Sequence, residues 1–327
     1  NKKVNGVAVS DIYKLHNYDT IECGNLYAYI IERVNRILTY KGMTGMIIPH
    51  SSICTDRMGT LCKILIKNGA WFSTYDTRPS KLFEGVDQRL LIYILGARKL
   101  YSTTYNRWYT TNRTNLFETL LYTETFSNKD YLSVAKISWD IEQSIYNKVV
   151  KYPSVSSKYD SYGKKIFYHN APRYFLRFSF APPYFYSDKV GEQVSGHVKN
   201  ICVELKYYND VVCVLNSSIF FWWFQLFSNC RDLVLREISF FRIPDIQLND
   251  HWPNVLNNDY EKNSFRKNTY YKTTGNVIYD EYYPSKSKPI IDEIDKVLAK
   301  HYGFTDEELD FIINYDIKYR MGDELSD

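Results

Sequence analysis

The sequence predicts an α/β protein in which helices alternate with strands of one sheet. Residues 25–38 and 55–67 carry apolar side chains at helical spacing. Residues 46–48, 71–75 and 89–95 are short apolar runs of strand length, and the last is apolar on both faces. Helices interleaved with buried strands are typical of a sheet covered on both sides. We therefore expect such a sheet in the first third of the chain.

The boundaries of these elements follow from residues that start or stop helices and strands. Asn25 is expected to cap the first helix, and Gly42 to follow its end. Pro49 closes the first strand, and Gly69 stops the second helix. The helix at 25–38 has its apolar side chains at Leu26, Ile30, Val34, Ile37 and Leu38.

The chain is long enough for two domains, and its character changes after the first sheet. Residues 1–96 are predicted to form the first domain segment, which contains this sheet. Residues 97–137 are polar and weakly periodic, so we expect a connecting region or one that faces a ligand. Residues 138–288 alternate short strands with Pro, Gly and Asn breaks and form a second domain. Residues 289–327 are expected to form a helical tail.

Within the second half, one strongly apolar helix is expected at 208–227, and its Trp222-Trp223 pair is predicted to be core. Residues 251–288 are polar and predicted to be rich in loops. Pro289 lies at the start of a terminal helix, and Thr305 with Glu308 resembles a capping box at the start of another.

Charge is spread unevenly along the chain. The whole sequence has a net charge of +4, and residues 291–327 contain 11 acidic and 4 basic side chains, which is −7 and leaves +11 for the first 290 residues. The positive charge of the first 290 residues suggests a polyanionic partner. Basic residues are dense at 141–180, with seven Lys or Arg against Glu142 and Asp160; a solvated charged face is the alternative interpretation.

Cysteine usage and apolar runs indicate a cytoplasmic protein without metal. The six cysteines include no Cys-x-x-Cys pair and are predicted to be small buried thiols in a reducing compartment. No signal peptide is visible, and the most apolar run, at 211–227, is interrupted by polar residues, so we expect no membrane span.

Three segments, in order, resemble the second half of a gamma-class N6-adenine DNA methyltransferase of the type II restriction–modification family, which includes fusions of methylase and nuclease. They are Asn-Leu-Tyr at 25–27, Gly-Met-Ile-Ile-Pro at 45–49, and Lys-Leu-Phe-Glu-Gly-Val at 81–86. The resemblance implies that the three strands are the fifth, sixth and seventh of a Rossmann-like sheet that binds S-adenosylmethionine, and that the last strand is antiparallel.

The same resemblance implies a role for Phe83. In this family an adenine flipped out of the duplex is held between two aromatic rings, one of which lies in the loop that 81–86 occupies. An extruded base loses its stacking neighbours, and stacking on an aromatic side chain offsets part of this loss by about 1–3 kcal/mol per base. The alternative is that Phe83 packs inward at the end of a strand.

The family's catalytic motif is missing from these residues. No Asn-Pro-Pro-Tyr occurs, and the nearest string, Ala-Pro-Pro-Tyr at 181–184, lacks the Asn and lies in the wrong half. No Gly-rich cofactor loop follows an N-terminal strand. We therefore expect the chain to begin in mid-domain, to lack any catalytic residue, and to be inactive by itself, with S-adenosylmethionine bound mainly upstream.

Residues 170–245 and the ending at 313–322 resemble the target-recognition region of the same enzymes, which binds double-stranded DNA. Phosphate contacts fix the register of such a protein, and base-edge contacts specify the site. The candidate DNA-binding side chains are Lys164, Lys165, Arg173, Arg177 and Arg231.

The sequence thus predicts part of a site-specific DNA methyltransferase that transfers a methyl group to N6 of adenine, with a nuclease either fused or separate. The alternative is a DNA-binding specificity module that partners a separate methylase subunit without catalysing the reaction. A third interpretation is an interaction protein that uses a surface rich in tyrosine, of which the chain has 31.

Overall fold

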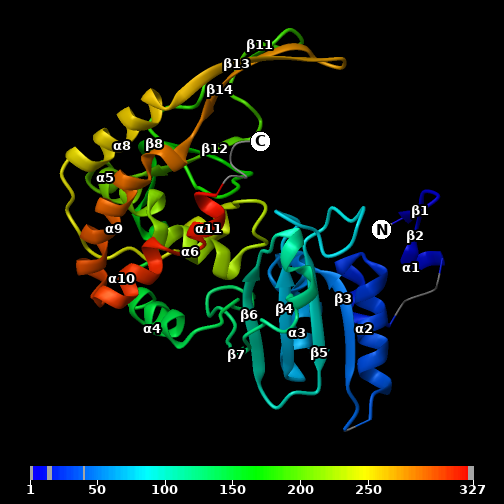
Figure 1. The fold of residues 1–327 in the computed structure, drawn as a ribbon. Helices are drawn as coiled ribbons and strands as arrows, with labels where there is room; N and C mark the ends of the chain where they lie inside the picture. Colours follow the sequence, from blue (N-terminus) through cyan, green and yellow to red (C-terminus); the bar gives the residue numbers. More distant parts are fainter. Residues whose placement is uncertain (1–2, 13–16, 40, 323–327) are drawn as a thin grey trace. The chain divides into compact units, whose positions relative to one another are not determined.

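A computed structural model describes residues 3–12, 17–39 and 41–322 and shows a mixed α/β chain with several sheets (Figure 1). The chain divides into two compact units. Unit 1 comprises the residues up to Gln143 together with Gln225–Asn229, and unit 2 comprises Ser144–Phe224 and the residues from Cys230 onward.

Unit 1 is built on a five-stranded sheet with the order β3-β5-β4-β6-β7. Strand β5 is antiparallel to both β3 and β4, whereas β4 and β6 are parallel. Since β3 and β4 both oppose β5, they run in the same direction. The strands are β3 (Thr44–Pro49), β4 (Ala70–Tyr75), β5 (Leu90–Leu95), β6 (Leu100–Asn106) and β7 (Thr123–Glu124). The three strands predicted in the first third are therefore confirmed.

The core of unit 1 lies between this sheet and two helices, α2 (Leu26–Ile37) and α3 (Gly59–Lys67). Tyr93 at the centre of β5 lies opposite Met46 on one side and Phe72 on the other. Tyr93 and Phe72 are buried with Leu61 and Leu65 of α3. Each such large apolar side chain stabilises the fold by about 1.5–3 kcal/mol.

The buried face of α2 differs from the apolar stripe in the sequence. Ala28, Ile31 and Glu32 are buried, whereas Ile30 and Ile37 are 48 % and 64 % exposed. The reason is polar: the Glu32 carboxylate accepts hydrogen bonds from the backbone N–H of Asp19 and Thr20, which turns this face toward the 3-10 turn at Asp19–Cys23. Asn25 is the N-cap residue, but its side chain donates to the Cys23 carbonyl instead of capping the helix.

Residues 97–137 belong to unit 1, where the sequence predicted a connecting region. Strand β6 lies inside the sheet between β4 and β7, and its Ser102 side chain bonds to neighbouring backbone. Ser102 Oγ lies 2.8 Å from the Ala135 carbonyl oxygen, to which it donates. Hydroxyls satisfied in this way allow a Ser/Thr-rich strand to be buried without cost from orphaned groups. The remaining elements are β1 (Lys3–Val4), β2 (Val7–Ala8) and α1 (Val9–Ile12).

Unit 2 contains two antiparallel sheets and most of the helices. One sheet has the order β12-β8-β9 and the other the order β11-β10-β14-β13. Its strands are β8 (Tyr159–His169), β9 (Phe178–Ser179), β10 (Phe185–Ser187), β11 (Gly191–Glu192), β12 (Val198–Val203), β13 (Ser264–Tyr271) and β14 (Gly275–Tyr282). Its helices are α5 (Tyr208–Asn216), most of α6 (Ser218–Phe227), α7 (Leu235–Ser239), α8 (His251–Lys262), α9 (Lys288–Tyr302), α10 (Asp306–Ile313) and α11 (Ile317–Arg320). The end of α6 from Gln225 belongs to unit 1, and α4 (Asp140–Val149) joins the units along the chain.

The single apolar helix predicted at 208–227 is wrong: it is two helices, α5 and α6, bent by 66° at Ser217. The Asn216 side chain bonds both the N–H and the carbonyl of Phe178 at 3.0 Å, which holds the end of α5 against β9. Trp222 and Trp223 are fully buried, as predicted. In the described part of the chain, no single helix is long and apolar enough to cross a membrane, and α5–α6 meets that length only as a bent pair.

Residues 251–288, predicted to be loops, form α8 and the β13–β14 hairpin. Polar composition misled here because β13 is largely solvent-exposed and β14 is mostly half-buried. The predicted terminal helix is α9, and the capping box before α10 is confirmed: Thr305 Oγ1 accepts from the Glu308 N–H, and Glu308 accepts from the Thr305 N–H. All six cysteines lie in the described ranges and none forms a disulfide there, and all but Cys202 are buried.

Candidate nucleic-acid interface

The loop between β4 and β5 presents Phe83 to solvent. Phe83 is 42 % exposed, while its neighbour Leu82 is only 6 % exposed. Leu82 packs in a small core with Tyr75 and Trp108. The inward-facing residue that fixes the loop is therefore Leu82, which leaves the Phe83 ring available at the surface of unit 1.

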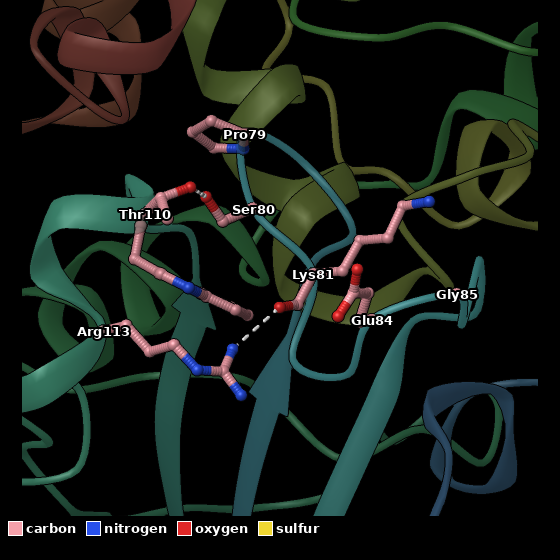
Figure 2. A pocket seen from close by; sticks show the side chains of 8 residues that line it. Pro79, Ser80, Lys81, Glu84, Gly85, Thr110 and Arg113 are labelled. Carbon is pink, nitrogen blue, oxygen red and sulfur yellow. Dashed lines mark hydrogen bonds between the residues drawn. The ribbon is translucent and has the colours of Figure 1, made fainter.

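Arg113 holds the backbone of this loop. Its guanidinium donates from Nη1 to the Lys81 carbonyl at 3.2 Å and from Nη2 to the Leu82 carbonyl at 2.8 Å; Figure 2 shows the first of these bonds. The Ser80 and Thr110 hydroxyls are 2.8 Å apart, which ties the same loop to the 3-10 turn that contains Arg113. These contacts hold the three residues that precede Phe83, so the aromatic side chain is positioned without a large entropy cost on ligand binding.

A cavity of about 480 Å³ lies beside the loop. Its lining consists of Pro79, Ser80, Lys81, Glu84, Gly85, Trp108, Thr110 and Arg113 (Figure 2). The Trp108 indole is 2 % exposed, and its N–H has no acceptor among the described residues. A buried donor of this kind costs free energy until an acceptor arrives. The cavity is thus lined by a buried indole and by cationic side chains, next to the segment that carries Phe83.

The end of β4 is fixed by a buried ion pair. Asp76 is 5 % exposed, and its Oδ2 accepts from Arg107 Nε at 3.0 Å, while Arg89 Nε lies 3.4 Å from Oδ1. Arg107 also donates to the Gln225 side chain at 2.9 Å. A carboxylate paired in this way, with its backbone at the strand end, holds the entry to the Phe83 loop in place.

The DNA-binding candidates in unit 2 fall into separate places. Lys164 and Lys165 lie exposed on β8, where the Lys164 ammonium is 4.1 Å from the Tyr208 ring centroid. Arg231 is exposed in the segment after α6. Arg173 and Arg177 are brought together, because both line one groove. Of the five predicted side chains, the structure thus groups two.

That groove has a volume of about 890 Å³. Its walls come from the end of β8, the segment before β9, the starts of β10 and β12, and the β13–β14 hairpin. Aromatic residues dominate its lining: His169, Tyr174, Phe175, Tyr184, Phe185, His197, Tyr279, Tyr282 and Tyr283. Aromatic walls with interspersed cations are typical of surfaces that bind nucleic acid.

Arg177 lies flat against one of these walls. Its guanidinium carbon is 3.6 Å from the Tyr282 ring centroid, and its Nη1 is buried without a hydrogen-bond partner among the described residues. Burial lowers the pKa of Arg177, although the group remains a cation. A guanidinium stacked on a ring and left with an unused N–H is suited to an anionic or carbonyl acceptor.

Two histidines lie at another part of the groove lining. The rings of His169 and His197 stack with centroids 5.5 Å apart. Burial lowers the pKa of His169, and the nearby His197 and Arg177 add to this effect. His169 Nδ1 accepts the Ala171 N–H at 3.1 Å, which is consistent with a neutral ring. No cluster of three or more His, Cys, Asp or Glu that could hold a metal occurs in the described ranges.

Sequence reasoning missed the β13–β14 side of the groove. Lys267 and the residues from Tyr279 to Tyr283 come from the part that was expected to be loops. The available signal was two runs rich in aromatic and β-branched residues on either side of Lys-Thr-Thr-Gly at 272–275, which is a hairpin pattern.

No protein-family model matches the chain, and no curated protein matches it. The interpretation of both surfaces therefore rests on their residues and geometry.

Proposed function

We propose that the chain is part of an adenine-specific DNA methyltransferase of a restriction–modification system. In this proposal unit 1 contributes the last strands of a Rossmann-like catalytic sheet and one wall of the pocket for the flipped adenine. Unit 2 is the target-recognition domain and binds the surrounding double-stranded DNA. S-adenosylmethionine supplies the methyl group, and it binds mainly outside these residues.

The observation that carries the proposal is the Phe83 loop. The ring is exposed while Leu82 anchors the loop, and Arg113 holds the adjacent carbonyls. An exposed ring on an anchored loop can stack on an extruded base, a contact of about 1–3 kcal/mol. The segment is also the one whose sequence resembles the family's base-stacking loop.

The sheet of unit 1 supports the same proposal. The resemblance implies an antiparallel last strand, and β5 is antiparallel to both of its neighbours. Strand β3 is an edge, because β5 is its only strand partner in the described part of the chain. An open edge with exposed Ile47 beside it is suited to pairing with a further strand. In this proposal the cofactor loop and Asn-Pro-Pro-Tyr lie in the segment or subunit that supplies that strand.

A specificity module without catalysis is the second candidate, and the absence of Asn-Pro-Pro-Tyr from the 327 residues favours it. Under this alternative the chain binds DNA and a separate methylase subunit brings the active site. The two differ in whether the tetrapeptide is encoded by the same gene, so the complete gene sequence discriminates them. An interaction protein with a Tyr-rich surface would bind no DNA.

The direct test is Phe83→Ala in the complete methyltransferase. We expect kcat/KM for adenine methylation to fall about 5- to 150-fold, the equivalent of one base stack, with little change in duplex affinity. Phe83→Tyr should retain most of the activity because it keeps the ring. Trp139→Ala is the matched control, since Trp139 is 52 % exposed in the same unit and lies outside the loop. Unchanged turnover in Phe83→Ala would remove the residue from the site.

A further inference from the structure

Arg177 brings to the groove of unit 2 a cation that no carboxylate contacts. Among the described residues, no acidic side chain lies within ion-pair distance of its guanidinium, and Glu261 and Asp280 act on it only from farther away. The Asp280 carboxylate is bound instead by Arg266, at 2.9 and 3.1 Å. The Glu261 carboxylate accepts from the Tyr282 hydroxyl at 3.0 and 3.1 Å. A partly buried charge without a partner costs free energy, so the groove favours an anionic ligand at Arg177.

Arg173 adds a second positive charge to the same lining. Its side chain is exposed. The lining also contains two carboxylates, and both are paired: Asp280 is bound as above, and Glu281 forms an ion pair with Lys267. Arg173 acts on Glu281 only from farther away. Two cations, Arg173 and Arg177, are thus left for a ligand, and a phosphate suits them because guanidinium groups bind its oxygens in pairs.

Two aromatic side chains of the lining have no ring partner in the described part of the chain. Phe185 on β10 lies opposite Tyr279 on β14, so the two side chains project from the same face of the sheet. Both are half-buried, and neither ring is stacked with another ring or with a cation among the described residues. By contrast, one face of Tyr282 is covered by Arg177. The Phe185–Tyr279 pair is therefore the part of the lining that is available to a flat ligand.

We propose that this groove binds one nucleotide whose base is unstacked, with the base on Phe185 and Tyr279. Its phosphate binds to Arg173 and Arg177. In an intact duplex the faces of a base are covered by its neighbours, and extrusion or single-strandedness exposes them. Aromatic side chains stack on the face of any base. The groove volume of about 890 Å³ lies in the range of about 300–1,000 Å³ that is typical of sites for small ligands.

Two sources supply a nucleotide of this kind. The first is a nucleotide extruded from the DNA that the chain binds, and this source rests on the proposed DNA-binding function of unit 2. The second is a free nucleotide in solution, which does not depend on that function. Both present the same chemistry to the groove, a flat base with an attached phosphate, so the experiment has one arm for each.

The first arm measures binding of the 327-residue chain by fluorescence anisotropy, with labelled duplexes that are fully paired or contain one unpaired thymidine. Thymidine is used because the pocket proposed for unit 1 takes adenine. We expect the unpaired thymidine to raise affinity about 5- to 150-fold, the equivalent of one base stack. Tyr279→Ala should remove most of this advantage and leave the affinity for paired duplex unchanged, whereas Tyr279→Phe keeps the ring and should keep the advantage. The controls are Tyr270→Ala, at a position that is 69 % exposed on β13 outside the groove lining, and Phe83→Ala in unit 1; both should keep the advantage.

The second arm measures binding of thymidine and of thymidine 5′-monophosphate by calorimetry. We expect the monophosphate to bind about tenfold more tightly than the nucleoside, because charge-assisted hydrogen bonds to its phosphate are added to the base stack. Arg177→Gln should remove most of this difference and leave the affinity for the nucleoside unchanged. Lys300→Ala alters an exposed cation on α9, outside the groove lining. It is the matched control and should change neither affinity.

The two arms together identify the source of the nucleotide. An advantage of the unpaired thymidine that depends on Tyr279 assigns the groove to a nucleotide extruded from DNA. Monophosphate binding that depends on Arg177, without that advantage, assigns the groove to a free nucleotide. Binding of paired duplex with neither effect would overturn this inference and leave the proposed function standing. Monophosphate binding that depends on Arg177, with no binding to any duplex, would support the groove and contradict the DNA-binding function of unit 2.

Discussion

The Arg113 guanidinium donates a 2.8 Å hydrogen bond from Nη2 to the Leu82 carbonyl, and this contact sets the direction of the Phe83 loop. The same guanidinium reaches the Lys81 carbonyl, so two consecutive peptide groups depend on one side chain. A fork of N–H donors makes such a double contact possible, and lysine cannot reproduce it. The position of Phe83 is therefore determined by a residue about thirty positions further along the chain.

Replacing Arg113 should loosen this loop. Arg113→Ala removes two hydrogen bonds to backbone, and we expect the free energy of unfolding to fall by about 1–2 kcal/mol. Limited proteolysis should show faster cleavage between residues 76 and 89, because the loop loses its anchor. Arg98→Ala, which alters an exposed arginine of the same unit, is the control. Equal cleavage rates in Arg113→Ala and the parent would contradict the anchoring role.

Arg173 is expected to contact the DNA backbone. It is exposed at the groove lining, where the Arg177 guanidinium already stacks on Tyr282. Arg173→Ala should weaken binding to duplexes of any sequence and reduce the slope of log K against log salt by about 1. Lys300→Ala should leave the slope unchanged. A variant with weaker binding but an unaltered slope would argue against a phosphate contact.

The open edge of β3 should make unit 1 prone to self-association. Ile47 and Ile94 are 48 % and 43 % exposed on strands β3 and β5. Ile47→Lys places a charge on the edge, which natural sheets use to prevent edge pairing. We expect light scattering to show less concentration-dependent association, with a change in stability below about 1 kcal/mol. Val190→Lys, at an exposed turn of unit 2, should have no such effect.

Stability should depend on pH through Asp295. This carboxyl is fully buried, and burial raises its pKa to about 7, although Ser218, Lys288 and Arg320 oppose the shift. The folded state therefore keeps a proton that the unfolded state releases above about pH 4. Stability from this group is present below pH 4, falls as pH rises toward 7, and then levels off.

Asp295→Asn tests this dependence. The variant keeps an oxygen that can accept the Ser218 N–H, which the parent bonds at 2.9 Å. Urea unfolding at several pH values should show that the difference between parent and variant changes with pH between pH 4 and 7, with a limiting slope of about 1.4 kcal/mol per pH unit. A difference that stays constant across this range would mean that Asp295 titrates normally.

The first strands of unit 1 were predictable because their apolar runs are short and bounded by breakers. Strand β6 was not, since its hydroxyl side chains are buried through bonds to backbone such as Ser102 to Ala135. The break between α5 and α6 was also hidden, because Asn216 and Ser217 interrupt an otherwise apolar run without a Gly or Pro. Both depend on partners that are remote in sequence.

The candidate sites also combine features that local sequence predicts with features that depend on residues remote in the sequence. Phe83 was identified from its segment, and its exposure follows from the burial of Leu82 and the reach of Arg113, neither of which is local. Arg173 and Arg177 were singled out as cations, but their shared groove depends on the β13–β14 hairpin. The polar sequence of this hairpin gives a weak periodic signal, so its position beside these arginines could not be predicted from the spacing of residues in the sequence.

The most direct test of the account is to sequence modified bases in the DNA of a host that expresses the complete gene. We expect N6-methyladenine at one defined sequence, and its loss when the gene is absent. We also expect Phe83→Ala to reduce the methylated fraction at that sequence, while Trp139→Ala does not. Genomic DNA without gene-dependent N6-methyladenine would contradict the central claim.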